Sequence, residues 1–268
     1  MLLNLDELTK RAIEVRNTLF DLKGKNALIV GGNKGIGQAM ALGLAGAGAN
    51  VCVVGRGPAG LDETAEAVRE IGSIGAYFAA DVTVEDQVKE MVAYNVEKFG
   101  KIDILINSQG LNYLQEATNF DTDQWQKVID VNVKSIFLCC KHVGRIMLQH
   151  KKGKIINISS VRGFQGRKED LAYSTSKGAI NQLTKSLAIE WGPQGINVNA
   201  IAPVFTLTNM TKSYLTDKEK LNWVLSRIPM GRLGQLDDFF GPPIFLASEA
   251  SNFVNGHILL VDGGWIAA

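Results

Sequence analysis

Tyr173 and Lys177 lie four residues apart in the segment Tyr173-Ser174-Thr175-Ser176-Lys177. On a helix this spacing brings both side chains to one face, with their polar ends close together. A free phenol has a pKa of about 10 and is a poor acid or base at neutral pH. A nearby ammonium group favours the phenolate, so the tyrosine can exchange a proton with an alcohol or a carbonyl oxygen. The same spacing also fits a surface pair that stabilises a helix by roughly a few tenths of a kcal/mol.

A serine that can share this chemistry is Ser160, thirteen residues before Tyr173. It follows the apolar run 154–159, which is typical of a buried parallel strand. Open α/β sheets bind ligands at the carboxyl ends of their strands. We therefore expect Ser160 to lie at a strand end, beside the helix that carries Tyr173.

A glycine-rich segment near the start of the chain is typical of a dinucleotide-binding turn. The apolar run 26–30 is followed by Gly31-Gly32-Asn33-Lys34-Gly35-Ile36-Gly37, which opens a helical stretch near 35–48. Gly31 and Gly35 allow a tight turn and a close approach of the backbone, and Gly37 lets the helix pack on the strand. The free N–H groups of the helix would face a pyrophosphate.

The order of these motifs resembles the short-chain dehydrogenase/reductase family over about residues 20–268. The resemblance implies an NAD(P)-dependent oxidoreductase that moves a hydride between nicotinamide and a carbonyl or secondary alcohol. The family's glycine pattern T-G-x-x-x-G-x-G is matched except that Val30 replaces threonine. The other matching positions are Asn107, Gly110, Asn132, Ser160, Tyr173, Lys177, Pro203, Thr208 and the terminal segment 261–264.

The resemblance implies one role for each of four catalytic residues. Tyr173 would be the general acid/base, and Ser160 would orient the reacting oxygen. Lys177 would bias the tyrosine toward phenolate and bind the nicotinamide ribose, and Asn132 would hold a water that links Lys177 to solvent. An alternative for Asn132 is that it caps or interrupts the long helix predicted over 121–150.

The residues after the second strand bear on cofactor choice. Arg56 stands where an acidic residue would bind the ribose 2′-hydroxyl of NAD, and an arginine there can pair with the 2′-phosphate of NADP. Lys34 adds a second cation, so we expect NADP(H) to be favoured over NAD(H), although Arg56 could instead be solvated. The cofactor-binding residues implied are Gly31, Asn33, Lys34, Gly35, Ile36, Gly37, Arg56, Asp81, Val82, Asn107, Gly110, Tyr173, Lys177, Pro203 and Thr208.

Three segments depart from the family pattern. Val30 lacks the hydroxyl that ties the glycine turn to the strand before Asn107, while Ser108 and Gln109 replace Asn and Ala in the family's N-N-A-G motif. We expect Ser108 and Gln109 to compensate for Val30, or Gln109 to intrude on the nicotinamide side. Val204 replaces a glycine after Pro203, which removes easy access to positive φ and is expected to reshape the loop.

Substrate binding is predicted in the loop between Ser160 and Tyr173. Arg162 and Arg167 lie there and can pair with an anionic group, although they also fit solvated or subunit-contact charges. A lid over about 205–233 would exclude water. The chain resembles the gluconate 5-dehydrogenase group of sugar-acid and polyol members. The alternatives are a 3-oxoacyl-carrier-protein reductase and a non-catalytic nucleotide sensor on the same fold.

The alternation of elements predicts a single-domain, doubly wound parallel sheet of about seven strands with helices on both faces, a Rossmann-type α/β fold. Strands are expected near 26–30, 50–55, 76–80, 102–106, 154–159, 196–201 and 257–261. Helices are expected near 35–48, 59–72, 84–99, 121–150, 172–191 and 237–247. Residues 1–22 predict an amphipathic helical extension before the catalytic domain, 23–268.

Composition excludes several classes of partner. The net charge of +1 and the absence of basic blocks argue against nucleic acid, and no apolar run is long enough to span a membrane. The three histidines and three cysteines show no metal or disulfide spacing. We expect a cytoplasmic enzyme for a small-molecule substrate. The family commonly forms tetramers, so a homotetramer or homodimer is expected, although the apolar faces of 121–150 and 172–191 would also suit a core.

Overall fold

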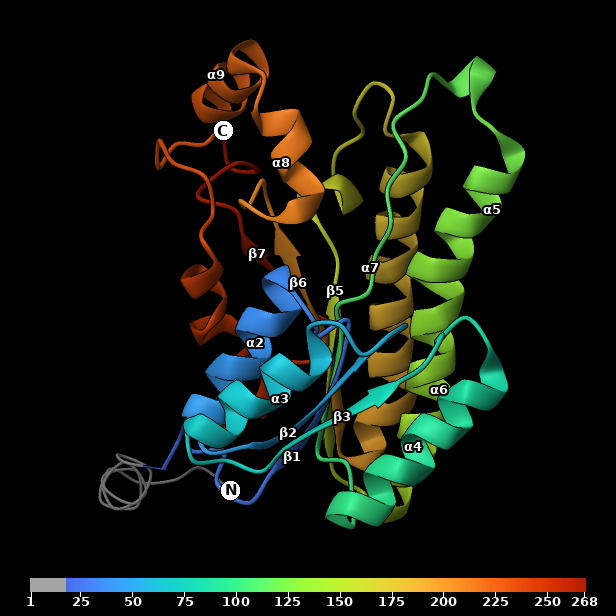
Figure 1. The fold of residues 1–268 in the computed structure, drawn as a ribbon, viewed down its shortest axis with the longest axis vertical. Coiled ribbons are helices and arrows are strands. Elements are labelled where there is room, and N and C mark those ends of the chain that lie inside the picture. The colour runs from blue at the N-terminus through green and yellow to red at the C-terminus, as the bar shows by residue number, and fades with distance from the viewer. Residues whose placement is uncertain (1–17) are drawn as a thin grey trace.

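The computed structural model describes residues 18–268, and these form one sheet of seven strands (Figure 1). The strand order is β3-β2-β1-β4-β5-β6-β7, and every neighbouring pair is parallel. The predicted doubly wound, Rossmann-type sheet is confirmed. The strands are β1 (Asn26–Val30), β2 (Asn50–Gly55), β3 (Gly75–Ala79), β4 (Ile104–Asn107), β5 (Gly153–Ile158), β6 (Ile196–Pro203) and β7 (Ile258–Val261).

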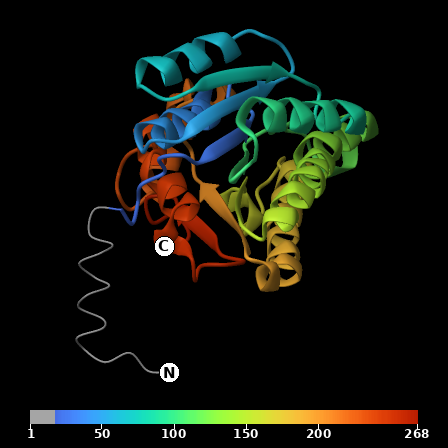
Figure 2. The same cartoon turned by 90° about the horizontal axis from the view of Figure 1, so that it is seen from below.

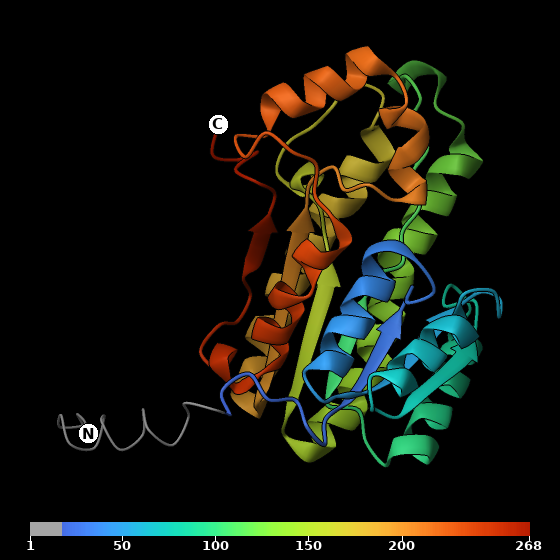
Figure 3. The same ribbon diagram turned by 60° about the vertical axis from the view of Figure 1, so that its left-hand side comes forward.

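Helices cover both faces of the sheet (Figure 2). One layer contains α2 (Gly35–Gly46), α3 (Leu61–Glu70) and α10 (Gly241–Ala247), and the other contains α4 (Glu85–Phe99), α6 (Ser135–His150) and α7 (Leu171–Trp191). The alternation within β1 shows why there are two cores, because Leu28 and Val30 face the second layer while Ala27 and Ile29 face the first. Two further helices, α8 (Asn209–Leu215) and α9 (Lys218–Arg227), lie beyond the carboxyl ends of the strands (Figure 3).

The predicted boundaries agree closely with the structure except in two helices. The single helix predicted over 121–150 is divided into α5 (Thr122–Ile129), a π-helix (Asp130–Lys134) and α6. The last predicted helix begins as a 3-10 turn, Leu236–Phe239, before α10. Most of the helix predicted over 1–22 lies outside the described residues, and the described part, 18–22, contains a turn and the fully buried Leu22.

The apolar faces that were considered for subunit pairing mostly belong to the core. Ile136, Leu138 and Trp191 are buried, and Leu183 and Leu187 pack against them. The large apolar side chains that remain exposed on α6 and α7 are Phe137, Leu171 and Ile189. The face available to a second subunit is therefore smaller than the sequence suggested.

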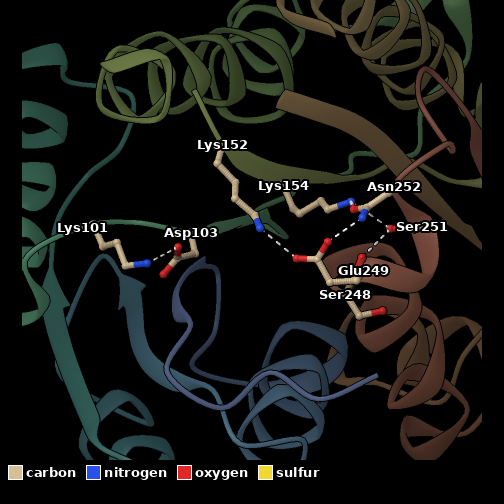
Figure 4. A network of polar contacts seen from close by, with 8 residues as sticks. All are labelled: Lys101, Asp103, Lys152, Lys154, Ser248, Glu249, Ser251 and Asn252. Carbon is tan, nitrogen blue, oxygen red and sulfur yellow. Dashed lines mark hydrogen bonds and ion pairs between the residues drawn. The ribbon is translucent and has the colours of Figure 1, made fainter. Parts of the chain in front are cut away.

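Charged side chains tie the amino end of β5 to the last third of the chain (Figure 4). Lys154 in β5 donates from Nζ to Asn252 Oδ1 at 3.0 Å and to Ser251 Oγ at 3.3 Å. Beside it, Lys152 pairs with Glu249 at 2.9 Å. Lys154 is only 7% exposed, so these contacts replace most of its water.

Lys154 is expected to make stability depend on pH. Burial lowers the pKa of Lys154 from its ordinary 10.5 to about 8. Between these values the unfolded chain binds more protons, so the free energy of unfolding rises with pH. Between about pH 7 and 9.5, the free energy of unfolding of wild type should therefore increase by about 1–2 kcal/mol relative to that of Lys154→Met. Urea unfolding across this range measures the difference, and Lys89→Met, at an exposed lysine, is the control. Equal dependence of stability on pH in wild type and Lys154→Met would contradict the expectation.

Candidate active site

The glycine turn between β1 and α2 depends on the absence of Cβ atoms. Gly31 has φ +81°, and a Cβ there would lie 2.7 Å from the Gln109 backbone nitrogen. A Cβ on Gly37 would lie 2.2 Å from the Gly31 carbonyl oxygen. Helix α2 starts with no side-chain cap and no acidic residue in its first turn, so its first N–H groups are available to an anion. This cradle fits the pyrophosphate of a dinucleotide.

Near this turn the chain differs from the family pattern, and backbone contacts hold the turn in place. Ser108 N donates to the Val30 carbonyl at 2.8 Å, which keeps the turn beside β4 without the missing hydroxyl. Gln109 Nε2 donates to Ser135 Oγ at 2.9 Å, so this side chain is tied to the start of α6. The compensation predicted through Gln109 is therefore wrong, because its amide reaches a helix and not the turn. Val204 is buried without a positive φ, so this loop does not require a glycine there.

Four predicted catalytic residues are carried by three adjacent segments. Ser160 follows β5, and its Oγ accepts from Arg162 N at 3.1 Å. Tyr173 and Lys177 lie on α7, with Lys177 Nζ 5.3 Å from the Tyr173 ring centroid. Lys177 Nζ donates to the Ile158 carbonyl at 2.6 Å, which brings the end of β5 against α7.

Asn132 interrupts the long helix and contacts the same region. It lies in the π-helix and is fully buried, and π-helical turns are frequent at functional sites. Its side chain accepts from Leu111 N at 2.7 Å and donates to the Leu111 carbonyl and Ser176 Oγ, both at 2.9 Å. Asn132 thus fastens the loop after β4 to α7, one residue before Lys177.

Burial controls the protonation of the tyrosine and the lysine. It raises the pKa of Tyr173 to about 12, with a smaller push from Asp170, against opposing effects of the Ser160 hydrogen bond and Arg162. It also lowers the pKa of Lys177 to about 7. The sequence predicted that Lys177 would lower the pKa of Tyr173. The structure gives the opposite direction, because burial outweighs the Ser160 hydrogen bond and the charge of Arg162, and burial also drives Lys177 toward neutrality.

The predicted cofactor residues divide into surface and core positions. Arg56 and Lys34 are exposed, and the side chain of neither residue forms a hydrogen bond or ion pair within residues 18–268. Burial alone would raise the pKa of Asp81, but hydrogen bonds from Thr83 and the charge of Arg56 lower it. Asn107 is fully buried and donates to Asn157 Oδ1 at 2.9 Å, so its side chain joins β4 to β5 and does not face the glycine turn.

The remaining cofactor positions line the carboxyl edge of the sheet. Thr208 caps α8, and its Cγ2 would lie 3.6 Å from a Cβ on Gly35, so the start of the predicted lid lies against the glycine turn. A Cβ on Gly110 would lie 4.0 Å from Lys177 Nζ. Asn33 donates to the Ala59 carbonyl at 3.4 Å, and Ile36 lies in the first turn of α2. Val82 is buried, and Pro203 is the last residue of β6.

Comparison with known proteins agrees with this geometry. A family model described as enoyl-(acyl carrier protein) reductase matches residues 30–266. A 2-dehydro-3-deoxy-D-gluconate 5-dehydrogenase from Bacillus subtilis is 45% identical, over 92% of this chain and 97% of that protein. The chain belongs to the short-chain dehydrogenase/reductase family. This short-chain dehydrogenase/reductase is thus an NAD(P)-dependent oxidoreductase acting on CH–OH groups.

This short-chain dehydrogenase/reductase is also similar to two gluconate 5-dehydrogenases. A gluconate 5-dehydrogenase from Gluconobacter oxydans is 38% identical over 92% of this chain and 96% of that protein. The structure of a gluconate 5-dehydrogenase from Burkholderia cenocepacia, in complex with NADP and tartrate, superposes with a TM-score of 0.89 at 36% identity. That match covers 93% of this chain and 98% of the other.

Two neighbouring cavities border the loop between Ser160 and Tyr173. The larger, of about 700 Å³, is lined by Arg162, Arg167 and by Tyr214 and Trp223 from α8 and α9. The smaller, of about 560 Å³, is lined by Ser174 and Thr175 beside Tyr173. The lid predicted over 205–233 does contribute aromatic side chains, whereas Met210 and Met230 are exposed.

Sequence analysis missed several residues at this short-chain dehydrogenase/reductase's site. Trp265 is 1% exposed, lines the larger cavity and donates to Gln165 Oε1 at 3.0 Å. Asp170 is 2% exposed and accepts from Asn112 Nδ2 at 2.9 Å. The only signal for Trp265 was its place after the terminal glycine turn, which says nothing of the cavity. No cluster of metal-ligating side chains occurs within residues 18–268, and no helix there could span a membrane.

Proposed function

We propose that this chain is an NADP(H)-preferring dehydrogenase or reductase of sugar acids or related polyols. Its reaction would use Tyr173, Ser160, Lys177 and Asn132. The observation that carries the proposal is the larger cavity, which has cationic and aromatic walls and borders the Ser160–Tyr173 loop. The names of the relatives support the same class of substrate, since gluconate dehydrogenases occur among both the sequence and the structural matches.

The cofactor would supply hydride chemistry when bound, and the protein would supply position and proton transfer. The glycine turn and the N–H groups of α2 would hold the pyrophosphate. Ser160 Oγ would donate a hydrogen bond to the reacting substrate oxygen and hold it against the Tyr173 hydroxyl. The raised pKa keeps Tyr173 protonated, so its hydroxyl would donate the proton to the substrate oxygen in reduction, and the same oxygen would take the proton back in oxidation. Lys177 would hold the ribose hydroxyls, and Asn132 would keep the loop after β4 in place.

Arg56 is proposed as the main determinant of NADP preference. It lies exposed at the carboxyl end of β2 and can form a charge-assisted pair with a 2′-phosphate. Arg56→Ala is expected to raise KM for NADP+ at least about 10-fold, because one such pair is lost. KM for NAD+, which lacks this phosphate, serves as the internal control. Equal changes for both cofactors would contradict this role.

The overall proposal is tested by following reduced nicotinamide absorbance with NADP+ over sugar acids, polyols and simple alcohols. Turnover of a sugar acid supports it. The panel includes a 3-oxoacyl-carrier-protein, reduced with NADPH, because the family model carries an acyl-carrier reductase description. Turnover of that substrate alone would favour the second function. Tight cofactor binding with no turnover would favour a nucleotide sensor.

Three broader features complete the proposal. Residues 23–268 would act as one catalytic domain, since β1–β7 share one sheet. The enzyme would work in the cytoplasm, beside the reactions that recycle its cofactor. It would assemble as a homodimer or homotetramer through the exposed Phe137, Leu171 and Ile189 of α6 and α7, which sedimentation velocity can test.

A further inference from the structure

Arg162 is a buried cation that packs against a pair of aromatic rings. It lies two residues after Ser160 and is 7% exposed. The centre of its guanidinium is 5.8 Å from the ring centroid of Phe205 and 5.5 Å from that of Trp265. Both distances are within the range of a cation–π contact. Because rings from two distant parts of the chain hold it, the guanidinium is fixed in place.

The charge of Arg162 is only partly satisfied by the protein. Its acidic partner is Asp170, with Nε and Oδ2 3.7 Å apart and both side chains nearly inaccessible. Nη2 is buried and has no hydrogen-bond partner. An unused donor on a buried cation is costly, since the group has lost water and gained nothing in return. A ligand that accepts a hydrogen bond from Nη2 would remove this cost.

The surroundings favour an anion as that ligand. Arg162 lines the larger cavity, whose wall contains five cationic side chains and two acidic ones. Asp170 is held from its other side by Asn112, whose Oδ1 is also buried without a partner. The unused donor of Arg162, which lies in the wall of this cavity, matches the carboxylate of an anionic ligand.

We propose that Arg162 binds the substrate carboxylate and thereby selects sugar acids over neutral polyols. This inference rests on the proposed function and assigns a specificity-determining residue to it. Arg167 does not take this part, because it is less buried than Arg162 and has no buried donor without a partner. The planar guanidinium of Arg162 can form two parallel hydrogen bonds with a carboxylate, which a lysine cannot do.

The test compares Arg162→Gln with wild type on D-gluconate and on its neutral counterpart, D-glucitol. The variant should lose about 100-fold in kcat/KM for D-gluconate and change less than about 3-fold for D-glucitol. Lys185→Gln is the control, since it removes one exposed charge from α7 at a position that lines neither cavity. It should leave the preference for the acid within about 3-fold of wild type. Arg162→Lys keeps the charge but lacks the two parallel donors of a guanidinium, and should lose about 10-fold in kcat/KM for D-gluconate.

A binding measurement separates this inference from the proposed function. Calorimetric titration of D-gluconate into the enzyme saturated with NADPH needs no turnover. Binding by wild type that is lost in Arg162→Gln supports the inference, even if the enzyme turns over no sugar acid and the proposed function fails. An unchanged affinity, or equal loss for D-gluconate and D-glucitol in a variant that still binds NADPH, overturns it. If Arg162→Gln does not fold, the same comparison is decided by Arg162→Lys.

Discussion

Tyr173→Phe is expected to lower kcat about 1000-fold while leaving the binding of the nicotinamide cofactor intact. The substitution removes the phenolic oxygen that would exchange the substrate proton and keeps the ring that lies beside Lys177. Lys177 cannot replace it, because Nζ is directed to the Ile158 carbonyl at 2.6 Å. Turnover is followed by nicotinamide absorbance, and cofactor binding by titration of NADPH fluorescence.

The control for this experiment is Tyr77→Phe, which removes a hydroxyl from the exposed edge strand β3. It should have wild-type activity. Turnover of Tyr173→Phe within about 10-fold of wild type would show that another group transfers the proton. Loss of NADPH binding in the same variant would show that Tyr173 acts mainly in holding the cofactor.

Gly37→Ala is expected to disrupt the glycine turn and the cofactor site with it. The new Cβ would lie 2.2 Å from the Gly31 carbonyl oxygen and 2.9 Å from its carbon, both of which are backbone atoms. Either α2 must move away from β1 or the turn must open. We expect a loss of about 2–4 kcal/mol in stability and at least about a 10-fold weaker affinity for NADPH. Thermal unfolding and NADPH titration measure the two effects.

The same helix supplies a matched control. A Cβ on Gly46, the last residue of α2, would meet no atom within 4 Å. Gly46→Ala should therefore raise stability by roughly 0.5–1 kcal/mol and leave cofactor binding unchanged. If Gly37→Ala had the same thermal stability and the same affinity for NADPH as Gly46→Ala, the close packing of α2 on the glycine turn would not be required.

Local patterns in the sequence determined most of the fold. Apolar runs and glycine turns placed all seven strands of the sheet, since the alternation of strand and helix is set by neighbouring residues. The spacing of Tyr173 and Lys177 placed both on α7, because a helix has a fixed period. The same reasoning could not show that Asn132 lies in a π-helix, since that turn depends on contacts with Leu111 and Ser176.

Burial and distant contacts were decided only by the tertiary structure. The spacing of Tyr173 and Lys177 predicted a lowered phenol pKa, but that pKa depends on the protein packed around it and is raised to about 12. Asn107 matches a cofactor motif, yet pairing of β4 with β5 turns its side chain into the core. Arg162 was one of several charges in a loop. Only folding brings Phe205 and Trp265 against it and leaves Nη2 without a partner, because its environment comes from segments that are far apart in the chain.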